Sequence, residues 1–337
     1  IIQVSEIEKK AALENYLKGE TAYNNNLINE SIIHFKKALD NVKVPAFYLA
    51  LGNSYYLTNE YDLALDNYQR CIELSETNSD KKSRIDALGG IGNIYGIKSS
   101  YETALDYYKQ ALKLAQEIGF DSGIANALGS IGNIYSINGE IDDAVSHLLR
   151  AIEIHKKIGN VRMAAIFTRV LASIYLNQGD IAKSLEMNKT SLPIFREIKD
   201  RYSEANCLAD IGLVYLANNE PGKAIEWLER ALKIHQELSD KKGEANQLSN
   251  LAMAYRKKGK GGGAIKLLKQ SLQIQKEIGY KLGEAGVLGN IGILYMDKGD
   301  HKNAFKYLEE ALKTQESIGD KSCVSLQESP RLPGTLY

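Results

Sequence analysis

Apolar residues recur along this chain at intervals of three and four positions, the spacing of a helix with one buried face. In one stretch, over residues 84–98, they stand at Ile85, Leu88, Ile91, Ile94 and Tyr95. After two serines the same spacing resumes over residues 101–118 and stops at Gly119, a residue type that commonly ends helices. The pattern therefore predicts a hairpin of two helices, each with a single apolar face.

The hairpin repeats, because a tyrosine returns every 40 residues, at Tyr55, Tyr95, Tyr135, Tyr175, Tyr215, Tyr255 and Tyr295. Nine residues after each tyrosine comes a small residue, namely Ala64, Ala104, Ala144, Ser184, Ala224, Ala264 and Ala304. Three residues before each comes another, namely Gly52, Gly92, Gly132, Ala172, Gly212, Ala252 and Gly292. Small residues in register indicate closely packed helices and place the tyrosines in the core between them. Since one hairpin cannot bury both of its apolar faces, neighbouring units must stack.

The run LGSIGNIYSINGEIDDA, from Leu128 to Ala144, carries this pattern of small residues and tyrosine in one segment. It resembles the tetratricopeptide repeat (TPR), and the resemblance extends over about residues 11–319. The 40-residue period is similar to that of the long-repeat branch, which includes kinesin light chains, spindle-orientation G-protein modulators and prokaryotic regulators. The resemblance implies an all-α fold, a right-handed superhelical solenoid of about eight antiparallel hairpins.

We expect a single solenoid over residues 1–320, followed by an irregular tail over 321–337, where Pro330 and Pro333 oppose a helix. The expected units are about 11–40, 45–77, 82–119, 122–159, 162–199, 202–239, 242–279 and 282–319. Three consecutive glycines at 261–263 predict a frayed helix start, and Pro193 predicts a kink. Because the chain begins with isoleucine instead of methionine, we also expect it to be part of a longer protein.

Charge and composition argue against several partners. The 42 basic residues equal the 42 acidic residues, so no excess positive charge favours nucleic acid or a membrane surface. The three cysteines are far apart and favour neither a disulfide framework nor a zinc site. No apolar run is long enough to span a membrane, and no export signal is visible. These features predict a cytoplasmic protein.

Catalytic and cofactor motifs are missing from the sequence. It contains no HExxH, GxSxG or phosphate-binding loop, and Gly89–Gly96 falls within an expected helix instead of after a strand. His155 and His235 occupy equivalent positions two units apart, so repeat symmetry explains them better than a metal site does. We therefore predict that the protein is not an enzyme and needs no metal or small-molecule cofactor.

The TPR resemblance implies that the first helix of each hairpin lines a concave groove that binds peptides. Polar residues expected on this face are Asn53, Asn93, Asn126, Asn133, Asn206, Asp210, Asn246, Asn250 and Asn290. Amides carry donors and an acceptor, so such a ladder could grip a peptide backbone, although it could also merely solvate the groove. Arg169, Arg256 and Lys257 are candidates for binding a carboxylate. The positions that hold basic residues in chaperone-binding members are Leu49, Ala50, Gly89 and Gly90, so a chaperone C-terminus is not expected.

Three functional hypotheses follow from these features. The first is a scaffold that binds a partner peptide or helix in the concave groove. The second is the regulatory or sensor region of a larger signalling or effector protein that carries a separate catalytic domain. The third is a structural role in self-association through the ends or convex faces.

Overall fold

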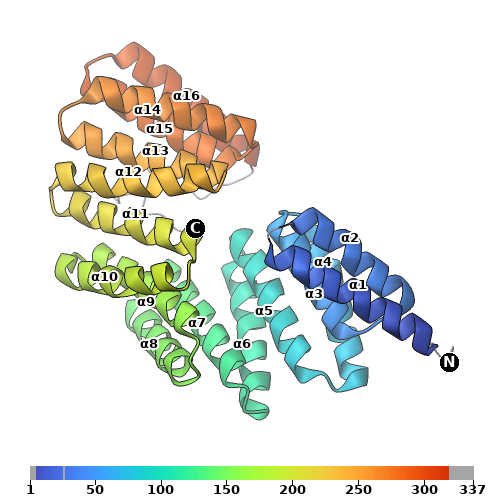
Figure 1. Cartoon of the computed structure of the whole chain (residues 1–337). Coiled ribbons are helices and arrows are strands. Elements are labelled where there is room, and N and C mark those ends of the chain that lie inside the picture. The colour runs from blue at the N-terminus through green and yellow to red at the C-terminus, as the bar shows by residue number, and fades with distance from the viewer. Residues whose placement is uncertain (1–4, 26, 319–337) are drawn as a thin grey trace. The chain divides into compact units, whose positions relative to one another are not determined.

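The computed structural model describes residues 5–25 and 27–318, and these form sixteen α-helices with no strand among them (Figure 1). Their bounds are α1 Glu6–Asn24, α2 Ile28–Asn41, α3 Pro45–Leu57, α4 Tyr61–Asn78, α5 Lys81–Ile97, α6 Tyr101–Glu117, α7 Asp121–Asn138, α8 Ile141–Lys157, α9 Val161–Asn177, α10 Ile181–Glu197, α11 Arg201–Ala217, α12 Pro221–Glu237, α13 Lys241–Lys257, α14 Gly261–Glu277, α15 Lys281–Asp297 and α16 His301–Ile318. The all-α prediction is confirmed. The predicted tail over 321–337 lies outside the described residues.

A left-handed residue recurs every 20 residues between helices. Its φ lies between 54° and 83° at Asn59, Ser79, Ser99, Gly119, Gly139, Gly159, Gly179, Lys199, Asn219, Ser239, Gly259, Gly279 and Gly299. Backbone amides of the turn also donate hydrogen bonds to carbonyls at the end of the preceding helix. For example, the Phe120 amide donates to the Ala115 carbonyl at 2.9 Å. The 40-residue period is thus two 17-residue helices with a three-residue turn after each, as in α5 and α6.

Some helix starts, including that of α5, have a side-chain cap. α5 begins at Lys81, three residues before the apolar pattern predicts, because the Asp80 carboxylate accepts a hydrogen bond of 3.1 Å from the Ser83 amide. α10 continues through Pro193, and α14 begins at Gly261 without a side-chain cap. In α5, apolar spacing locates the helix interior, whereas Asp80, a polar residue outside that pattern, caps the first turn.

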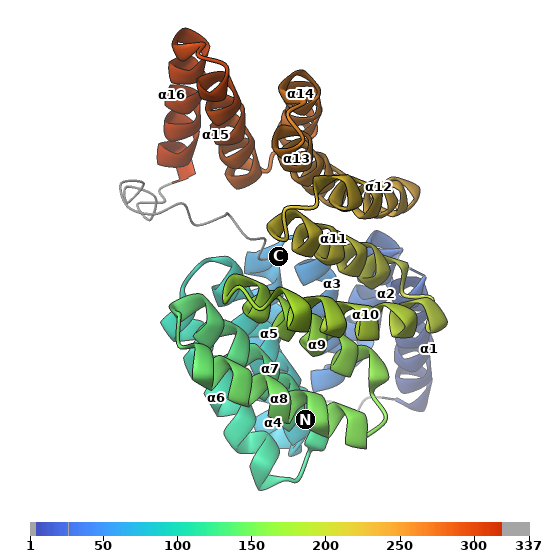
Figure 2. The same ribbon diagram turned by 90° about the vertical axis from the view of Figure 1, so that its left-hand side faces the viewer.

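The chain divides into two compact units, residues 1–167 and 168–337, with the boundary inside α9. Unit 1 holds α1–α8 and the beginning of α9, and unit 2 holds the rest of α9 and α10–α16. Within each unit, consecutive helices pack side by side, as α13 with α14 and α15 with α16 in Figure 2. The single solenoid over 1–320 stays a prediction.

In unit 1 the small residues make room for aromatic rings. The ring of Tyr68, on α4, lies between Gly52 of α3 and Gly90 of α5. A Cβ atom would lie 2.7 Å from Tyr68 Cδ1 if added at Gly52, and 2.5 Å from Cζ if added at Gly90. Both distances are too short for any residue larger than glycine unless the ring moves. The glycines thus let three helices approach one tyrosine.

The tyrosines that recur every 40 residues pack less deeply than expected. Tyr55 is buried, but the other six are partly exposed. Tyr95, for example, stacks on Tyr107 with ring centroids 5.7 Å apart at the edge of the packing. The buried tyrosines of unit 1 also include Tyr68 and Tyr108, which belong to the second helices of their hairpins.

Unit 2 uses the same small-residue packing. Ala224 and Ala264 are fully buried, and a Cβ added at Gly212 would lie 2.7 Å from Leu228 Cγ.

None of the described helices has the length and hydropathy that a membrane span requires. No cluster of three or more metal-ligating side chains occurs in the part of the chain that the structure describes.

Candidate functional site

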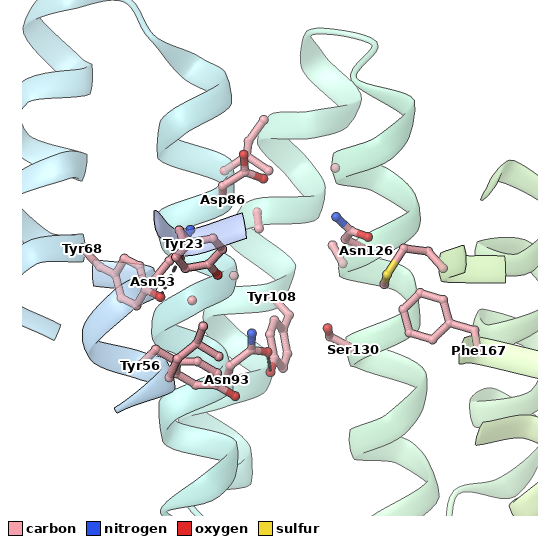
Figure 3. A pocket seen from close by; sticks show the side chains of 18 residues that line it. Tyr23, Asn53, Tyr56, Tyr68, Asp86, Asn93, Tyr108, Asn126, Ser130 and Phe167 are labelled. Carbon is pink, nitrogen blue, oxygen red and sulfur yellow. Dashed lines mark hydrogen bonds between the residues drawn. The ribbon is translucent and has the colours of Figure 1, made fainter. Parts of the chain in front are cut away.

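Unit 1 contains a half-open pocket of about 420 Å³ (Figure 3). Its walls come from first helices α3, α5 and α7, from second helices α4 and α6, and from α1 and the beginning of α9. The lining residues are Tyr23, Asn53, Tyr56, Leu57, Tyr68, Ile85, Asp86, Gly89, Gly90, Asn93, Tyr108, Ala111, Gly123, Asn126, Ala127, Ser130, Met163 and Phe167. We call this set the unit 1 pocket.

Glycines shape the pocket. A Cβ added at Gly89 would meet no atom within 4 Å, so this position leaves open space above α5. Gly129 has the opposite surroundings, because any side chain there would collide with the Phe167 ring. Phe167 also stacks on the buried His155 ring, with centroids 5.6 Å apart. The pocket therefore has open space over Gly89, and the Phe167 ring of its wall fills the space beside Gly129.

Two tyrosine hydroxyls orient two asparagines in the pocket. The Tyr68 hydroxyl donates to Asn53 Oδ1 at 2.8 Å, and the Tyr108 hydroxyl donates to Asn93 Oδ1 at 2.7 Å (Figure 3). The pairs are equivalent, one repeat apart. Since the carbonyl end of each amide is engaged, its Nδ2 group, with two N–H donors, is left for a ligand. The orientation of the two amides depends on buried tyrosine rings of the second helices, so it follows from the packing of each hairpin.

Asp86 brings a charge to the pocket. Its side chain extends from α5, with Tyr23 and Asn53 on one side of it and Asn126 on the other (Figure 3). The carboxylate remains accessible to solvent, but surrounding protein atoms partly desolvate it, and Asp80 adds a like charge. Desolvation, with the smaller effect of Asp80, raises the pKa of Asp86 to about 6.

The remaining predicted asparagines of unit 1 lie on α7. Asn126 lines the pocket, whereas Asn133 does not. The Oδ1 atom of each is buried and has no hydrogen-bond partner among the described residues. Unpaired buried acceptors are uncommon in folded proteins, because each loses its hydration without compensation. Of the predicted site residues, the structure therefore brings Asn53, Asn93 and Asn126 into one pocket.

The predicted charged residues of unit 2 are paired with each other or with neighbours. Arg169 Nη1 donates to Asp210 Oδ2 at 2.7 Å, between α9 and α11. Arg256 Nε donates to Asp297 Oδ2 at 2.5 Å, between α13 and α15. Lys257 Nζ donates to the Leu216 carbonyl at 2.8 Å. These side chains link the first helices of neighbouring hairpins, so their positive charge is largely used within the protein.

The predicted amides of unit 2 differ in exposure. Asn250 is buried, and its Nδ2 donates to Gln247 Oε1 at 3.2 Å, which is a packing role. Asn206, Asn246 and Asn290 are partly exposed on α11, α13 and α15. None of the four lines the unit 1 pocket. Their part in binding stays a prediction.

Sequence reasoning missed Asp86 and the pocket tyrosines. Asp86 holds the repeat position that carries asparagine in three other units, Asn126, Asn206 and Asn246. Aligning the units at that position would have singled out the acid. No sequence pattern marks Tyr68 and Tyr108 as pocket residues, because their position on second helices suggests core residues only. Whether a tyrosine hydroxyl reaches an asparagine of the first helix depends on how the two helices pack.

The repeat architecture agrees with a comparison of sequence families. A family model described as MalT-like TPR region matches residues 39–319. The chain belongs to this TPR family. The match covers seven of the eight expected units and begins near the end of the first, the unit whose pattern is most degenerate. No curated protein matches the chain significantly.

Solved TPR structures share the fold at low sequence identity. A Rap protein complexed with competence and sporulation factor has a TM-score of 0.75 and 14% identity, covering 94% of this chain and 89% of that one. The Rap conjugation gene regulator of plasmid pLS20, in complex with the Phr* peptide, has a TM-score of 0.66 and 16% identity, covering 82% and 74%.

A third similar structure belongs to a longer protein. It is a signal transduction ATPase with numerous domains and a tetratricopeptide repeat sensor, from Pyrococcus horikoshii, with a TM-score of 0.64 and 15% identity. The alignment covers 91% of this chain and 47% of that chain, so this TPR chain matches about half of the longer protein. At these identities the three structures establish the fold alone.

Proposed function

We propose that this protein is a peptide-binding module and that the unit 1 pocket holds a segment of a partner protein. The observation that carries the proposal is the pair of Tyr–Asn hydrogen bonds, Tyr68 to Asn53 and Tyr108 to Asn93. Each fixes an amide with its Nδ2 donors free, and the two stand on adjacent first helices. Preorganised donors reduce the entropy lost on binding, which favours recognition of peptide carbonyls.

The size of the pocket and its mixed lining suit a peptide. A volume of about 420 Å³ lies in the range of small-ligand pockets and accommodates only a few residues of a chain. Aromatic rings and aliphatic atoms offer apolar contact, while the amides offer hydrogen bonds. The Rap proteins described above are TPR proteins seen with peptide partners, which supports the same class of ligand here. The proposal gives the protein no catalytic role and keeps a cytoplasmic location as a prediction.

The second candidate is a sensor region within a larger signalling protein. It is favoured by the similarity to the Pyrococcus horikoshii ATPase, whose name includes a tetratricopeptide repeat sensor. Both candidates use the same pocket and differ in what the binding event controls. A change in ATP hydrolysis of the full-length protein when a peptide binds would favour the second candidate, and peptide binding without any catalytic activity to control would favour the first.

A selection of displayed random peptides tests the proposed binding. Peptides that bind the wild type are titrated against a variant with Asn53→Ala, Asn93→Ala and Asn126→Ala, after circular dichroism shows equal helicity. Loss of up to three hydrogen bonds, each contributing about 0.5–1.5 kcal/mol, is expected to weaken binding at least tenfold.

The matched control changes Asn206, Asn246 and Asn290 to alanine in unit 2. This variant removes the same number of amides from first helices outside the unit 1 pocket, so the proposal predicts a smaller loss of affinity than in the unit 1 variant. Absence of any selected peptide, or equal affinity of the wild type and the unit 1 variant, would overturn the proposal.

A further inference from the structure

The unit 1 pocket contains an uncompensated negative charge. Of its eighteen described lining residues, Asp86 alone is charged. No described basic side chain forms an ion pair or hydrogen bond with Asp86. This differs from the acids on first helices of unit 2, since Asp210 is paired with Arg169 and Asp297 with Arg256. An acid without an internal counter-ion in a pocket attracts a cation from outside.

The neutral groups around Asp86 also suit a cation. The Tyr68 and Tyr108 hydroxyls donate their protons to Asn53 and Asn93, so each phenol oxygen can act only as an acceptor toward a further group. Tyr23 and Tyr56 add two further aromatic rings to the wall. Ring faces attract ammonium and guanidinium groups through their quadrupole. Burial raises the pKa of all four tyrosines, so they stay neutral and leave Asp86 as the source of charge.

The repeat indicates that the acid is not required for folding. Three other units carry asparagine at the position of Asp86, namely Asn126, Asn206 and Asn246. An amide of nearly the same shape is therefore compatible with this place on the first helix. The carboxylate adds a charge that the architecture does not need, and it is partly desolvated at a cost to the fold.

We propose that the unit 1 pocket binds a cationic group of the partner peptide, an alkylammonium or a guanidinium, with Asp86 as its counter-ion. The inference rests on the proposed peptide-binding function and specifies its ligand. In this arrangement the cation lies against Asp86 and the tyrosine rings, while the amides of Asn53 and Asn93 donate to carbonyls of the adjoining peptide backbone.

The test uses pools of synthetic pentapeptides that are acetylated and amidated at their ends. Each pool fixes the central residue as Lys, Arg, Gln, Met or Glu and randomises the other four among uncharged residues. Binding of each fluorescein-labelled pool is measured by polarisation. The Lys and Arg pools are expected to bind the wild type about tenfold more tightly than the Gln pool, the effect of one favourable partly buried ion pair.

Two variants assign the preference to Asp86. The Asp86→Asn variant, which installs the residue of three other units, is expected to bind the Lys and Arg pools no more tightly than the Gln pool. The Asp106→Asn variant removes the same charge from an exposed site on α6 outside the pocket and is expected to keep the preference. Loss of the preference in both variants would show a nonspecific charge effect and overturn the proposal.

A sixth pool distinguishes the two sources of an ammonium group. It has a free N-terminus and glutamine at its centre. Tighter binding of this pool than of its acetylated counterpart, abolished in Asp86→Asn, identifies the chain terminus as the cation and supports the proposal.

The remaining outcomes separate this inference from the proposed function. Equal binding of the Lys, Gln and free-terminus pools to the wild type, with all of them weakened by the Asn53, Asn93 and Asn126 variant, overturns the cationic preference and leaves peptide binding supported. Failure of every pool to bind overturns both.

Discussion

The Tyr108 hydroxyl donates a hydrogen bond of 2.7 Å to Asn93 Oδ1, and Tyr68 makes the same bond to Asn53 one repeat earlier. A residue of the second helix thus sets the orientation of an amide on the first helix. The buried ring of Tyr108 belongs to the packing of α5 and α6, while its hydroxyl belongs to the pocket. Folding of the hairpin and preparation of the binding surface therefore share one side chain.

Removing that hydroxyl is expected to affect stability and binding together. Tyr108→Phe keeps the ring and loses the bond, so the free energy of unfolding should fall by about 0.5–1.5 kcal/mol. Affinity for a selected peptide should also fall, because the Asn93 amide is no longer held. Urea denaturation and a binding titration measure the two effects. Tyr107→Phe is the control, since Tyr107 lies outside the pocket. Unchanged affinity in Tyr108→Phe would refute the orienting role.

Two adjacent glycines of α5 should respond oppositely to alanine. Gly89→Ala places a methyl group in open space and favours the helix, so stability should rise by roughly 0.5–1 kcal/mol. Gly90→Ala places it 2.5 Å from Tyr68 Cζ, so the ring must move and stability should fall by about 1–3 kcal/mol. Urea denaturation of both variants measures the difference. Equal effects would show that the glycines do not control the position of Tyr68.

The raised pKa of Asp86, about 6, makes the stability of the protein depend on pH. The folded state binds this proton more tightly than the unfolded chain, whose aspartate has a pKa near 3.9. The resulting stabilisation is complete below about pH 4 and is lost as the pH rises to about 6. Asp86→Asn cannot ionise, so it should be more stable than the wild type at pH 7.5 and similar at pH 4.

Thermal melts at pH 4, 5, 6 and 7.5 measure this dependence, with Asp106→Asn as a control for net charge. The titratable groups near Asp86 are Tyr23 of α1, Tyr56 of α3, Tyr68 and Cys71 of α4, Tyr108 of α6 and Asp80 before α5. The tyrosines and Cys71 stay neutral across this range because burial raises the pKa of each. A difference between the wild type and Asp86→Asn that does not change with pH would contradict the assignment.

His155 provides a dependence on pH of the opposite sign. Its ring is fully buried, and neither ring nitrogen has a partner among the described residues. Burial lowers the pKa of His155, so the folded state resists a proton that the unfolded chain accepts near pH 6.5. The stability that depends on the neutral ring is present above pH 6.5 and is lost as the pH falls, by up to about 1.4 kcal/mol per pH unit.

Replacement of His155 by phenylalanine should remove this sensitivity. Phe195 occupies the equivalent position one repeat later, so a phenylalanine is compatible with this packing. Urea denaturation from pH 7.5 to 5.5 should show a smaller loss of stability for His155→Phe than for the wild type. His301→Phe changes an exposed histidine and serves as the control. Parallel curves for the wild type and His155→Phe would contradict the interpretation.

Much of the fold was predictable from the sequence because repetition multiplies a weak local signal. Apolar spacing located α5 and α6, and the resemblance of residues 11–319 to TPR proteins is confirmed by the family match over 39–319. The small residues at Gly52 and Gly92 marked close helix packing correctly, since a side chain at either would collide with Tyr68 or Tyr108.

The candidate site was less predictable, because the environment of a polar residue depends on packing between units. Asn53 and Asn250 look alike in the sequence, yet Asn53 lines the pocket and Asn250 is buried against Gln247. The pairing of Arg169 with Asp210 joins residues 41 positions apart, which no pattern within one helix reveals. Asp86 was visible only as a departure from asparagine across units.

The proposed function requires that a partner peptide lies in the unit 1 pocket. Photo-crosslinking tests it most directly, with a selected peptide that carries a diazirine residue and mass spectrometry of the crosslinked protein. We expect crosslinks to the pocket residues of α3, α5 and α7, and their loss when excess unlabelled peptide competes. Crosslinks confined to unit 2, or to exposed faces of α4, α6 and α8, would contradict it.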